Sequence, residues 1–326
     1  MSADLAFVFA AGDGQIGRQS VHLLRSIRRH HPDAPVYAYV PVDERDAMAA
    51  DIREALTDGA TVLNGEIPVE GYPISTKIGA IAAAEDATDA DHLLMLDTDT
   101  VLLDVINVHG ERDANLYLKP VDVGRQFWGR NRSRERWLKL YDRYEIPVPE
   151  WRVESTFDGI EMFPYWNAGF ALESLDSGGI GEEWLRYTQD LYGEIPYDRH
   201  ADQVALGLVS AVPGRSVAVL NDRYNHPLHL RLSCPADVQV LHYHNRRELA
   251  VVRDASLRRE LAAVGLNPET DRLSPSYVRF LADRFQRWIR RRTLPIDEAH
   301  AIEQVYLKLR RLTGTVRQSD NEGSQP

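Results

Sequence analysis

The chain has 326 residues, of which 44% are hydrophobic and 27% charged, and its formal net charge is −11. This length and apolar share predict a globular protein with one large domain and an appended segment, or with two small domains. The negative charge excludes nucleic acid as a general partner, because phosphate backbones are bound by clustered basic residues. Cys234 is the one cysteine, so the chain has neither an intrachain disulfide nor a zinc–thiolate pair.

Signals for membrane insertion or secretion are missing from the sequence. No run approaches the roughly 18 consecutive apolar residues of a membrane-spanning helix. Residues 1–4 lack the basic and then apolar layout that begins a signal peptide. The sequence therefore predicts a cytoplasmic protein.

Short apolar runs alternate with helix-spaced patterns through the first hundred residues. The helix spacing is plain at Val21, Leu24 and Ile27, which share one helix face. The expected elements are, in order, a strand at 5–11, a helix at 20–30, a strand at 36–40, a helix at 44–56, a strand at 61–63, a helix at 76–84 and a strand at 92–96. Such alternation predicts an α/β fold with a doubly wound, mostly parallel, Rossmann-like sheet, whose ligands lie at the carboxyl ends of the strands.

The periodicity weakens over residues 121–166, where aromatic residues collect among arginines. We interpret this stretch as an insertion in a domain over 1–245. Regular structure is expected again in a strand at 168–172, helices at 182–192 and 202–209, and a strand at 239–243. A helical carboxyl-terminal segment over 246–318 and a disordered tail over 319–326 complete the predicted organisation.

Asp97 and Asp99 directly follow the apolar run at 92–96. In an extended segment residues i and i+2 point the same way, so both carboxylates can face one ion. Mg²⁺ or Mn²⁺, held by carboxylates and substrate phosphates, neutralises the charge that develops on a diphosphate leaving group. The alternative is a pair of solvated loop acids or a helix cap. The preceding strand favours the metal site.

His242 and His244 lie near the end of the strand expected at 239–243. Imidazole beside carboxylates is an acceptable ligand for Mn²⁺ and related metals. Either histidine, taken alone, also fits a structural or exposed side chain. The order of the motifs favours His242 as the third metal ligand.

Two further polar segments lie between the acidic pair and the histidines. In Asn167-Ala168-Gly169 an amide stands beside small residues, which lets the backbone approach a ligand while the amide reads a polar edge such as a sugar hydroxyl. The alternative for this segment is a turn into a strand. Asp202 and Gln203 open a predicted helix, where the alternative for the acid is an amino-terminal cap or a partner of the helix dipole.

In this order the segments resemble the GT-A glycosyltransferases, most closely family 8, which includes glycogenin-like and lipopolysaccharide sugar transferases. The resemblance runs from about residue 7 to residue 244 and rests on four places, 93–99, 166–169, 202–203 and 241–243. It implies transfer of a hexose from a nucleoside diphosphate sugar, a UDP-sugar first, to a glycan, lipid-linked or other hydroxyl acceptor, with retention of configuration. It also implies a GT-A fold and bound Mn²⁺ or Mg²⁺. We expect the insertion at 121–166 to lie on the acceptor side, with its aromatic residues stacked on acceptor faces.

The resemblance gives each of these residues an expected role. The metal ligands are Asp97, Asp99 and His242, and the catalytic pair is Asp202 with Gln203. The residues expected to bind the donor are Ala10, Gly12, Asp13, Lys77, Asp97, Thr98, Asn167, Ala168 and Gly169. After the histidine the family continues with a glycine and a Lys-Pro-Trp stretch, whereas this chain has Tyr243-His244-Asn245-Arg246-Arg247. One of the two arginines would then take the place of the phosphate-binding lysine.

Three other functions fit parts of the sequence. Gly12, Gly14 and Gly17 match a dinucleotide-binding loop, with Asp43 after the second strand, and this pattern fits an NAD(P)-dependent oxidoreductase. The start Ala10-Ala11-Gly12 also fits a sugar nucleotidyltransferase. A non-catalytic scaffold of the same shape, acting through its carboxyl-terminal helix, is the third alternative.

Residues 277–292 carry apolar side chains at helical spacing, with arginines between them. Such a basic amphipathic helix predicts peripheral contact with anionic lipid, which suits an enzyme with a lipid-linked acceptor. The alternative is a helix that packs its apolar face on the main domain.

Overall fold

A computed structural model defines the fold of the first of two compact units, Met1–Ser274 and Pro275–Pro326. The residues it describes are 5–107, 114–129, 133–231, 233–244 and 246–267. The helix expected at 277–292 and the tail expected at 319–326 lie outside the described residues. The predicted boundary at residue 245 stays a prediction.

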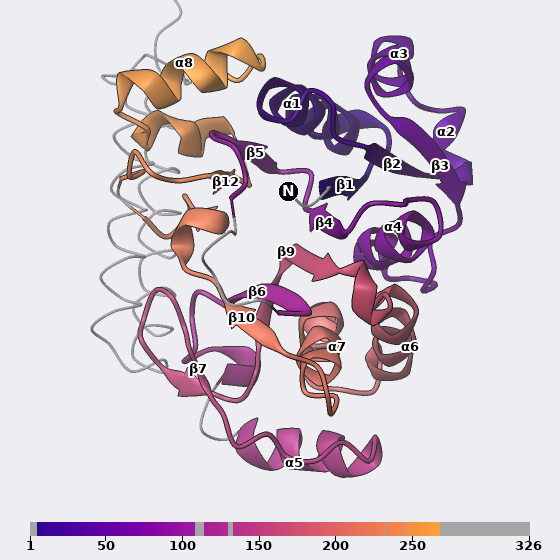
Figure 1. Cartoon of the computed structure of the whole chain (residues 1–326), viewed down its shortest axis with the longest axis vertical. Coiled ribbons are helices and arrows are strands. Elements are labelled where there is room, and N and C mark those ends of the chain that lie inside the picture. The colour runs from indigo at the N-terminus through magenta and orange to yellow at the C-terminus, as the bar shows by residue number, and fades with distance from the viewer. Residues whose placement is uncertain (1–4, 108–113, 130–132, 232, 245, 268–326) are drawn as a thin grey trace, which may run out of the picture. The chain divides into compact units, whose positions relative to one another are not determined.

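A seven-stranded sheet stands at the centre of the described part of the chain, in the order β10-β6-β9-β4-β1-β2-β3 (Figure 1). Its strands are β1 (Leu5–Ala10), β2 (Val36–Pro41), β3 (Thr61–Gly65), β4 (His92–Leu96), β6 (Leu116–Pro120), β9 (Trp166–Ser174) and β10 (Val217–Val219). β9 runs antiparallel to its neighbours β4 and β6, and the other neighbouring pairs are parallel. The predicted α/β fold with a mostly parallel sheet is confirmed.

Helices cover both faces of this sheet, because successive side chains of a strand point to opposite sides. Phe7 and Leu94 pack with α1 and α3 on one face, whereas Val8 and Met95 pack with α4, α6 and α7 on the other (Figure 1). The helices are α1 (Gly14–His30), α2 (Val42–Arg45), α3 (Ala50–Gly59), α4 (Thr76–Glu85), α5 (Arg134–Arg143), α6 (Gly181–Leu191), α7 (Ala201–Ser210) and α8 (Ala255–Ala263). The sheet is therefore doubly wound, as predicted.

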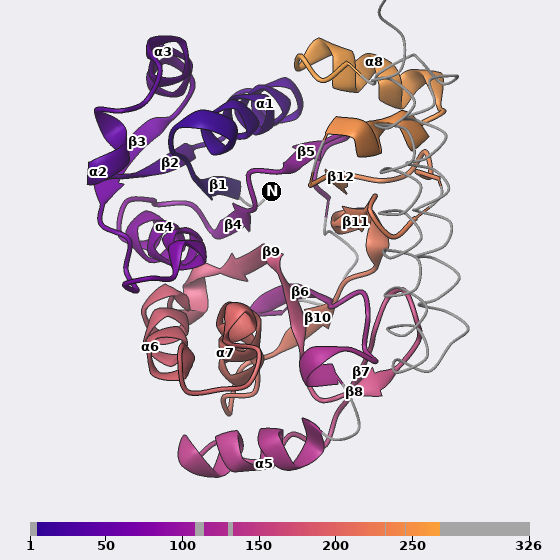
Figure 2. The same ribbon diagram turned by 180° about the vertical axis from the view of Figure 1, so that it is seen from behind.

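A three-stranded sheet lies beyond the end of β4 (Figure 2). It consists of β5 (Thr100–Leu102), β12 (Val240–His242) and β11 (His226–Pro227). β12 is antiparallel to β5, with His242 opposite Thr100. This pairing brings the late histidines to the acidic pair, although more than 140 residues separate them in sequence.

α8 packs back on the first helix of the chain. The Glu260 carboxylate accepts a hydrogen bond of 3.0 Å from Arg29, and His22 Nδ1 lies 2.7 Å from the Val264 carbonyl oxygen. Leu261 of α8 is fully buried. The segment after β12 is thus anchored to the amino-terminal part of the fold.

Two expectations about regular structure were wrong. The helix expected at 44–56 is broken into α2 and α3, because Met48 turns into the core and the Ala49 N–H donates to the Asp13 carboxylate at 3.4 Å. The stretch at 121–166 contains helix α5 and a two-stranded sheet of β7 (Val153–Glu154) and β8 (Glu161–Met162), despite its weak periodicity.

The aromatic residues of that stretch form a buried cluster. Trp137 lies at its centre, with ring centroids 5.4 Å from Trp128 and 5.8 Å from Tyr141. The Trp137 indole N–H donates to the Trp128 carbonyl at 2.9 Å, so its polar group is satisfied inside the core. These buried rings cannot stack on an acceptor sugar, so the prediction is wrong for Trp128, Trp137 and Tyr141. In the same stretch Trp151 is 38% exposed and Phe127 is partly buried.

Two carboxyl groups meet at the amino end of α6. Glu173 of β9 is 1% exposed, and Glu85 ends α4. The Ile180 N–H donates to both, at 2.8 Å to Glu85 and 3.0 Å to Glu173. Burial, followed by the neighbouring charge of Glu85, raises the pKa of Glu173 well above its ordinary value.

Glu173→Gln is expected to reduce the loss of stability at high pH. With a raised folded-state pKa, Glu173 stabilises the fold fully below its unfolded pKa of 4.5, and this contribution is lost as pH rises through the folded pKa. Urea unfolding at about pH 5 and about pH 8 should show a smaller fall in the free energy of unfolding for the variant than for the wild type. An equal fall would contradict the assignment, and Glu182→Gln, at an exposed acid of α6, is the control.

Candidate functional site

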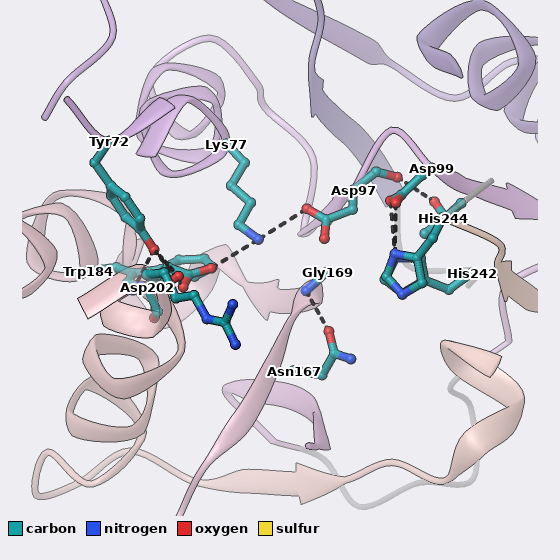
Figure 3. Close-up of polar contacts among 12 residues, drawn as sticks. Tyr72, Lys77, Asp97, Asp99, Asn167, Gly169, Trp184, Asp202, His242 and His244 are labelled. Atoms are coloured by element: carbon teal, nitrogen blue, oxygen red, sulfur yellow. Dashed lines mark hydrogen bonds and ion pairs between the residues drawn. The ribbon is translucent and has the colours of Figure 1, made fainter. Parts of the chain in front are cut away.

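The acidic pair, Lys77, Asn167, Gly169, Asp202 and the two late histidines meet at the carboxyl end of β4 (Figure 3). β4 ends at Leu96, and the next N–H, of Asp97, donates to the Gly169 carbonyl at 3.0 Å. Because β9 is antiparallel to β4, its amino end, which carries Asn167, lies at this edge of the sheet. The antiparallel strand therefore places the Asn-Ala-Gly segment beside the acidic pair.

The Asp99 carboxylate lies between two imidazoles. Its Oδ1 is 3.1 Å from His242 Nε2, and its Oδ2 is 3.2 Å from His244 Nδ1. One ligand atom from each of the three residues falls within 4.8 Å of the others, close enough to hold a metal ion. His242 is 5% exposed, and apart from the contact of Nε2 with Asp99 its ring nitrogens have no hydrogen-bond partner in the described part of the chain. Buried polar atoms without partners suit a metal ligand.

The charges of this group stabilise one another. Burial opposes ionisation of Asp99, but the neighbouring imidazoles outweigh it and hold the pKa of Asp99 well below its ordinary value. Burial alone would lower the pKa of His242, yet the Asp99 charge raises it. Asp99 is therefore ionised at neutral pH, and a bound cation would take over the compensating charge that protonated imidazole supplies.

Lys77 lies on the other side of the site, between two carboxylates. Its Nζ is 3.1 Å from both Asp97 Oδ1 and Asp202 Oδ2. Burial alone would lower the pKa of Lys77, but the charges of Asp97 and Asp202 raise it above the ordinary value. Asp97 thus forms an ion pair with Lys77, whereas the histidines contact Asp99. The role of Asp97 as a metal ligand stays a prediction.

Asp202 is fixed from several directions. It is 2% exposed, its Oδ1 accepts a hydrogen bond of 2.9 Å from the Tyr72 hydroxyl, and its carbonyl accepts one of 2.8 Å from Trp184 Nε1. The residue that caps α7 is His200, so the helix-cap alternative for Asp202 is wrong. Gln203 is partly exposed beside it. The catalytic roles of this pair stay predictions.

The backbone of the Asn-Ala-Gly segment lies close to the Asp97 carboxylate. A Cβ atom on Gly169 would lie 2.6 Å from Asp97 Oδ2, so a side chain there would displace the carboxylate. Asn167 Oδ1 accepts from the Gly169 N–H at 2.9 Å, and its amide donates to Asp122 at 3.3 Å. Ala168 is 1% exposed and packs into the core. Only its backbone is left to contact a donor.

The glycine loop after β1 carries an acid that the sequence analysis did not single out. Glu44 of α2 accepts a hydrogen bond of 3.1 Å from the Asp13 N–H, and a Cβ on Gly12 would lie 1.9 Å from the same Glu44 oxygen. A dinucleotide pyrophosphate would need such loop N–H groups for itself. A Cβ on Gly17 would lie 2.3 Å from the Gly12 carbonyl oxygen, so this glycine serves packing between loop and helix.

The sequence model of the Rhodobacterales glycosyltransferase domain matches residues 7–214. The chain belongs to this family of glycosyltransferases. The interpretations as an NAD(P)-dependent oxidoreductase and as a sugar nucleotidyltransferase are therefore wrong, and the resemblance to glycosyltransferases is confirmed. A comparison with curated proteins gives no match.

Three solved glycosyltransferase structures are distantly similar. The galactosyltransferase LgtC in complex with donor and acceptor sugar analogs has a TM-score of 0.48 and 19% identity, over 82% of this chain and 99% of LgtC. An active-site mutant of LgtC has a TM-score of 0.49, with the same identity and coverage. GlyE of Streptococcus pneumoniae has a TM-score of 0.45 and 15% identity, over 88% of this chain and 64% of GlyE.

Sequence reasoning missed several polar residues of the site in this glycosyltransferase. Asp122 follows the buried strand β6, just as Asp97 follows β4, so the same rule could have found it. Burial works against its charge, but the Lys119 ammonium outweighs this and lowers the pKa of Asp122 to about 2. Tyr72 and Glu44 left no such signal, because only tertiary packing brings them to Asp202 and to the glycine loop.

None of the helices in the described part of the chain has the length and apolar character needed to cross a membrane.

Lys77→Met is expected to destabilise the fold by about 3 kcal/mol at neutral pH, because Asp97 and Asp202 would remain buried without a cation. Urea unfolding measures the loss, which should be smaller at about pH 5, where a carboxylate can neutralise itself by binding a proton. Lys77→Arg keeps the charge and is the matched control. A loss below about 1 kcal/mol for the methionine variant would show that the ion pairs contribute little.

Proposed function

We propose that this glycosyltransferase takes its sugar from a nucleoside diphosphate sugar, a UDP-sugar first, and depends on Mn²⁺ or Mg²⁺. The observation that carries the proposal is the Asp99 carboxylate facing His242 at 3.1 Å, with the buried ammonium of Lys77 on the other side of Asp97. An anion with two phosphates needs positive charge at more than one point. This edge of the sheet offers a cation site and a lysine together.

The residues proposed to hold the ion are Asp99 and His242, with Asp97 as the second carboxylate of the motif. Their oxygen and nitrogen donors suit Mn²⁺. When bound, such an ion stabilises the negative charge of a departing diphosphate. Lys77 adds a fixed charge beside the donor, and Asp202 holds that ammonium at 3.1 Å. Retention of configuration, with Asp202 and Gln203 acting at the sugar, is part of the same proposal.

The proposed acceptor is a hydroxyl group of a glycan or of a lipid-linked glycan. Tyr197 supports this, because its ring is 44% exposed and meets Phe127 edge-on at 5.4 Å. Exposed aromatic faces stack on sugar rings. Both residues have positive φ, +61° and +48°, and Phe127 also touches His200 at the start of α7, two residues before Asp202. Membrane contact through 277–292 stays a prediction.

A panel of nucleotide sugars with and without Mn²⁺ tests the proposed function through nucleotide release. We expect turnover of at least one donor, its loss in EDTA and its recovery on adding Mn²⁺. Asp99→Asn should lower kcat/KM at least about 100-fold, because metal assistance is worth several kcal/mol.

Asp104→Asn, at an exposed acid after β5, is the control for that variant. No turnover of any donor with any divalent ion would contradict the proposal. Absence of turnover together with intact donor binding would favour the scaffold alternative.

Tyr197→Ala is expected to raise the KM for the acceptor by about 3- to 10-fold, because one aromatic stacking contact is worth roughly 1 kcal/mol. Donor hydrolysis without acceptor should stay unchanged, so the two rates separate acceptor binding from donor chemistry. Val219→Ala, at another exposed residue, is the control. An unchanged acceptor KM would remove Tyr197 from the acceptor site.

A further inference from the structure

His244 stands two residues beyond β12, in a place where the proposed metal ligands leave it without a role. Its Nδ1 is 3.2 Å from Asp99 Oδ2, on the oxygen that His242 does not face. Its ring centroid is 4.2 Å from that of His242 (Figure 3). It is also 4.2 Å from the ring centroid of His229. Asp99 is therefore enclosed by imidazole groups, with one histidine against each carboxylate oxygen.

The backbone of His244 is held in an unfavourable conformation. Its φ is +38°, in the left-handed region that residues other than glycine rarely adopt. Such a conformation is unfavourable and persists where the surrounding structure imposes it. The flanking chain does so here, because His242 pairs with Thr100 and the Tyr243 N–H donates to the Asp99 carbonyl at 3.0 Å. The strain directs the His244 imidazole to the Asp99 carboxylate.

One oxygen of Asp97 is already paired, because its Oδ1 is 3.1 Å from Lys77 Nζ, whereas its Oδ2 points to the space over Gly169. Among the described residues, Asp99, His242 and His244 bring ligand atoms within 4.8 Å of one another. They supply one carboxylate and two imidazole nitrogens beside Asp97, the second carboxylate of the motif.

These three proposed ligands form a site with one buried and one exposed side. The His242 side chain is 6% exposed, whereas that of His244 is 41% exposed. An ion held between them would keep positions on the His244 side for phosphate oxygens. Mg²⁺ prefers oxygen ligands in a strict octahedron, whereas Mn²⁺ and Co²⁺ accept imidazole readily.

We infer that His244 is a direct ligand of the divalent ion, so that Asp99, His242 and His244 form a site that selects Mn²⁺ or Co²⁺ over Mg²⁺. The inference rests on the proposed metal dependence and adds the identity of a ligand and of the preferred ion. The competing explanation is that His244 only forms an ion pair with Asp99.

Direct metal binding separates these explanations. Pulsed electron paramagnetic resonance of Mn²⁺ bound to the full chain, without donor, counts coupled imidazole nitrogens, and we expect two histidines. His244→Gly should leave one, because glycine removes the ring and accepts positive φ. The same variant should weaken Mn²⁺ binding at least about tenfold, since losing even an outer partner of a ligand costs 10–100-fold. Mg²⁺ binding should change by a smaller factor.

A second substitution of His244 and one control variant complete the test. His244→Asn retains a side chain that tolerates positive φ, and it should also lose one nitrogen coupling. His200→Ala removes a histidine near Asp202, outside the ligand group, and should leave both the couplings and the Mn²⁺ affinity unchanged. Thermal unfolding of each variant confirms that the chain is folded.

The outcomes distinguish this inference from the proposed function. One imidazole coupling in the wild type, unchanged in His244→Gly, would overturn the role of His244 and leave the metal-dependent function standing. Equal affinities for Mg²⁺ and Mn²⁺ would overturn the selectivity. Absence of divalent-ion binding, together with full turnover in EDTA, would overturn the proposed metal dependence itself.

Discussion

The ammonium group of Lys77 is the contact on which the arrangement of the site depends. It lies 3.1 Å from carboxylates at the end of β4 and at the start of α7, elements more than 100 residues apart in sequence. Asp202 is 2% exposed, and burying its charge costs several kcal/mol unless a counterion compensates. The lysine thus allows two acids to stand at one edge of the sheet. It also gives Asp97 a different counterion from Asp99, which lies between two imidazoles.

The site therefore has two electrostatic halves. On one side an ammonium ion compensates Asp97 and Asp202, and on the other imidazoles compensate Asp99. Ammonium keeps its proton over the whole physiological range, whereas imidazole gives it up readily in exchange for a metal ion. The site therefore offers an ammonium group and the proposed cation site beside each other. In the proposed function, the oxygens of a diphosphate span the two.

The sequence was informative wherever local patterns decide structure. Apolar runs that end in acids located β4 and the Asp97-Thr98-Asp99 motif, and strand–helix alternation predicted the doubly wound sheet. The antiparallel direction of β9 could not be predicted, because strand direction depends on the path of the chain between elements. Three-residue strands such as β5 and β12 are too short for a period to be visible. The pairing that brings His242 to Thr100 is likewise a tertiary event.

The path of the chain through β12 has a consequence for how this protein can vary. The matched glycosyltransferase domain ends at residue 214, so it contains Asp99 but neither His242 nor His244. The histidines enter on a short strand that pairs with β5, outside the main sheet. The two proposed histidine ligands and the main sheet therefore reside in different stretches of sequence. Substitutions at residues 242 and 244 can thus change the proposed ion preference while the strands of the main sheet stay as they are.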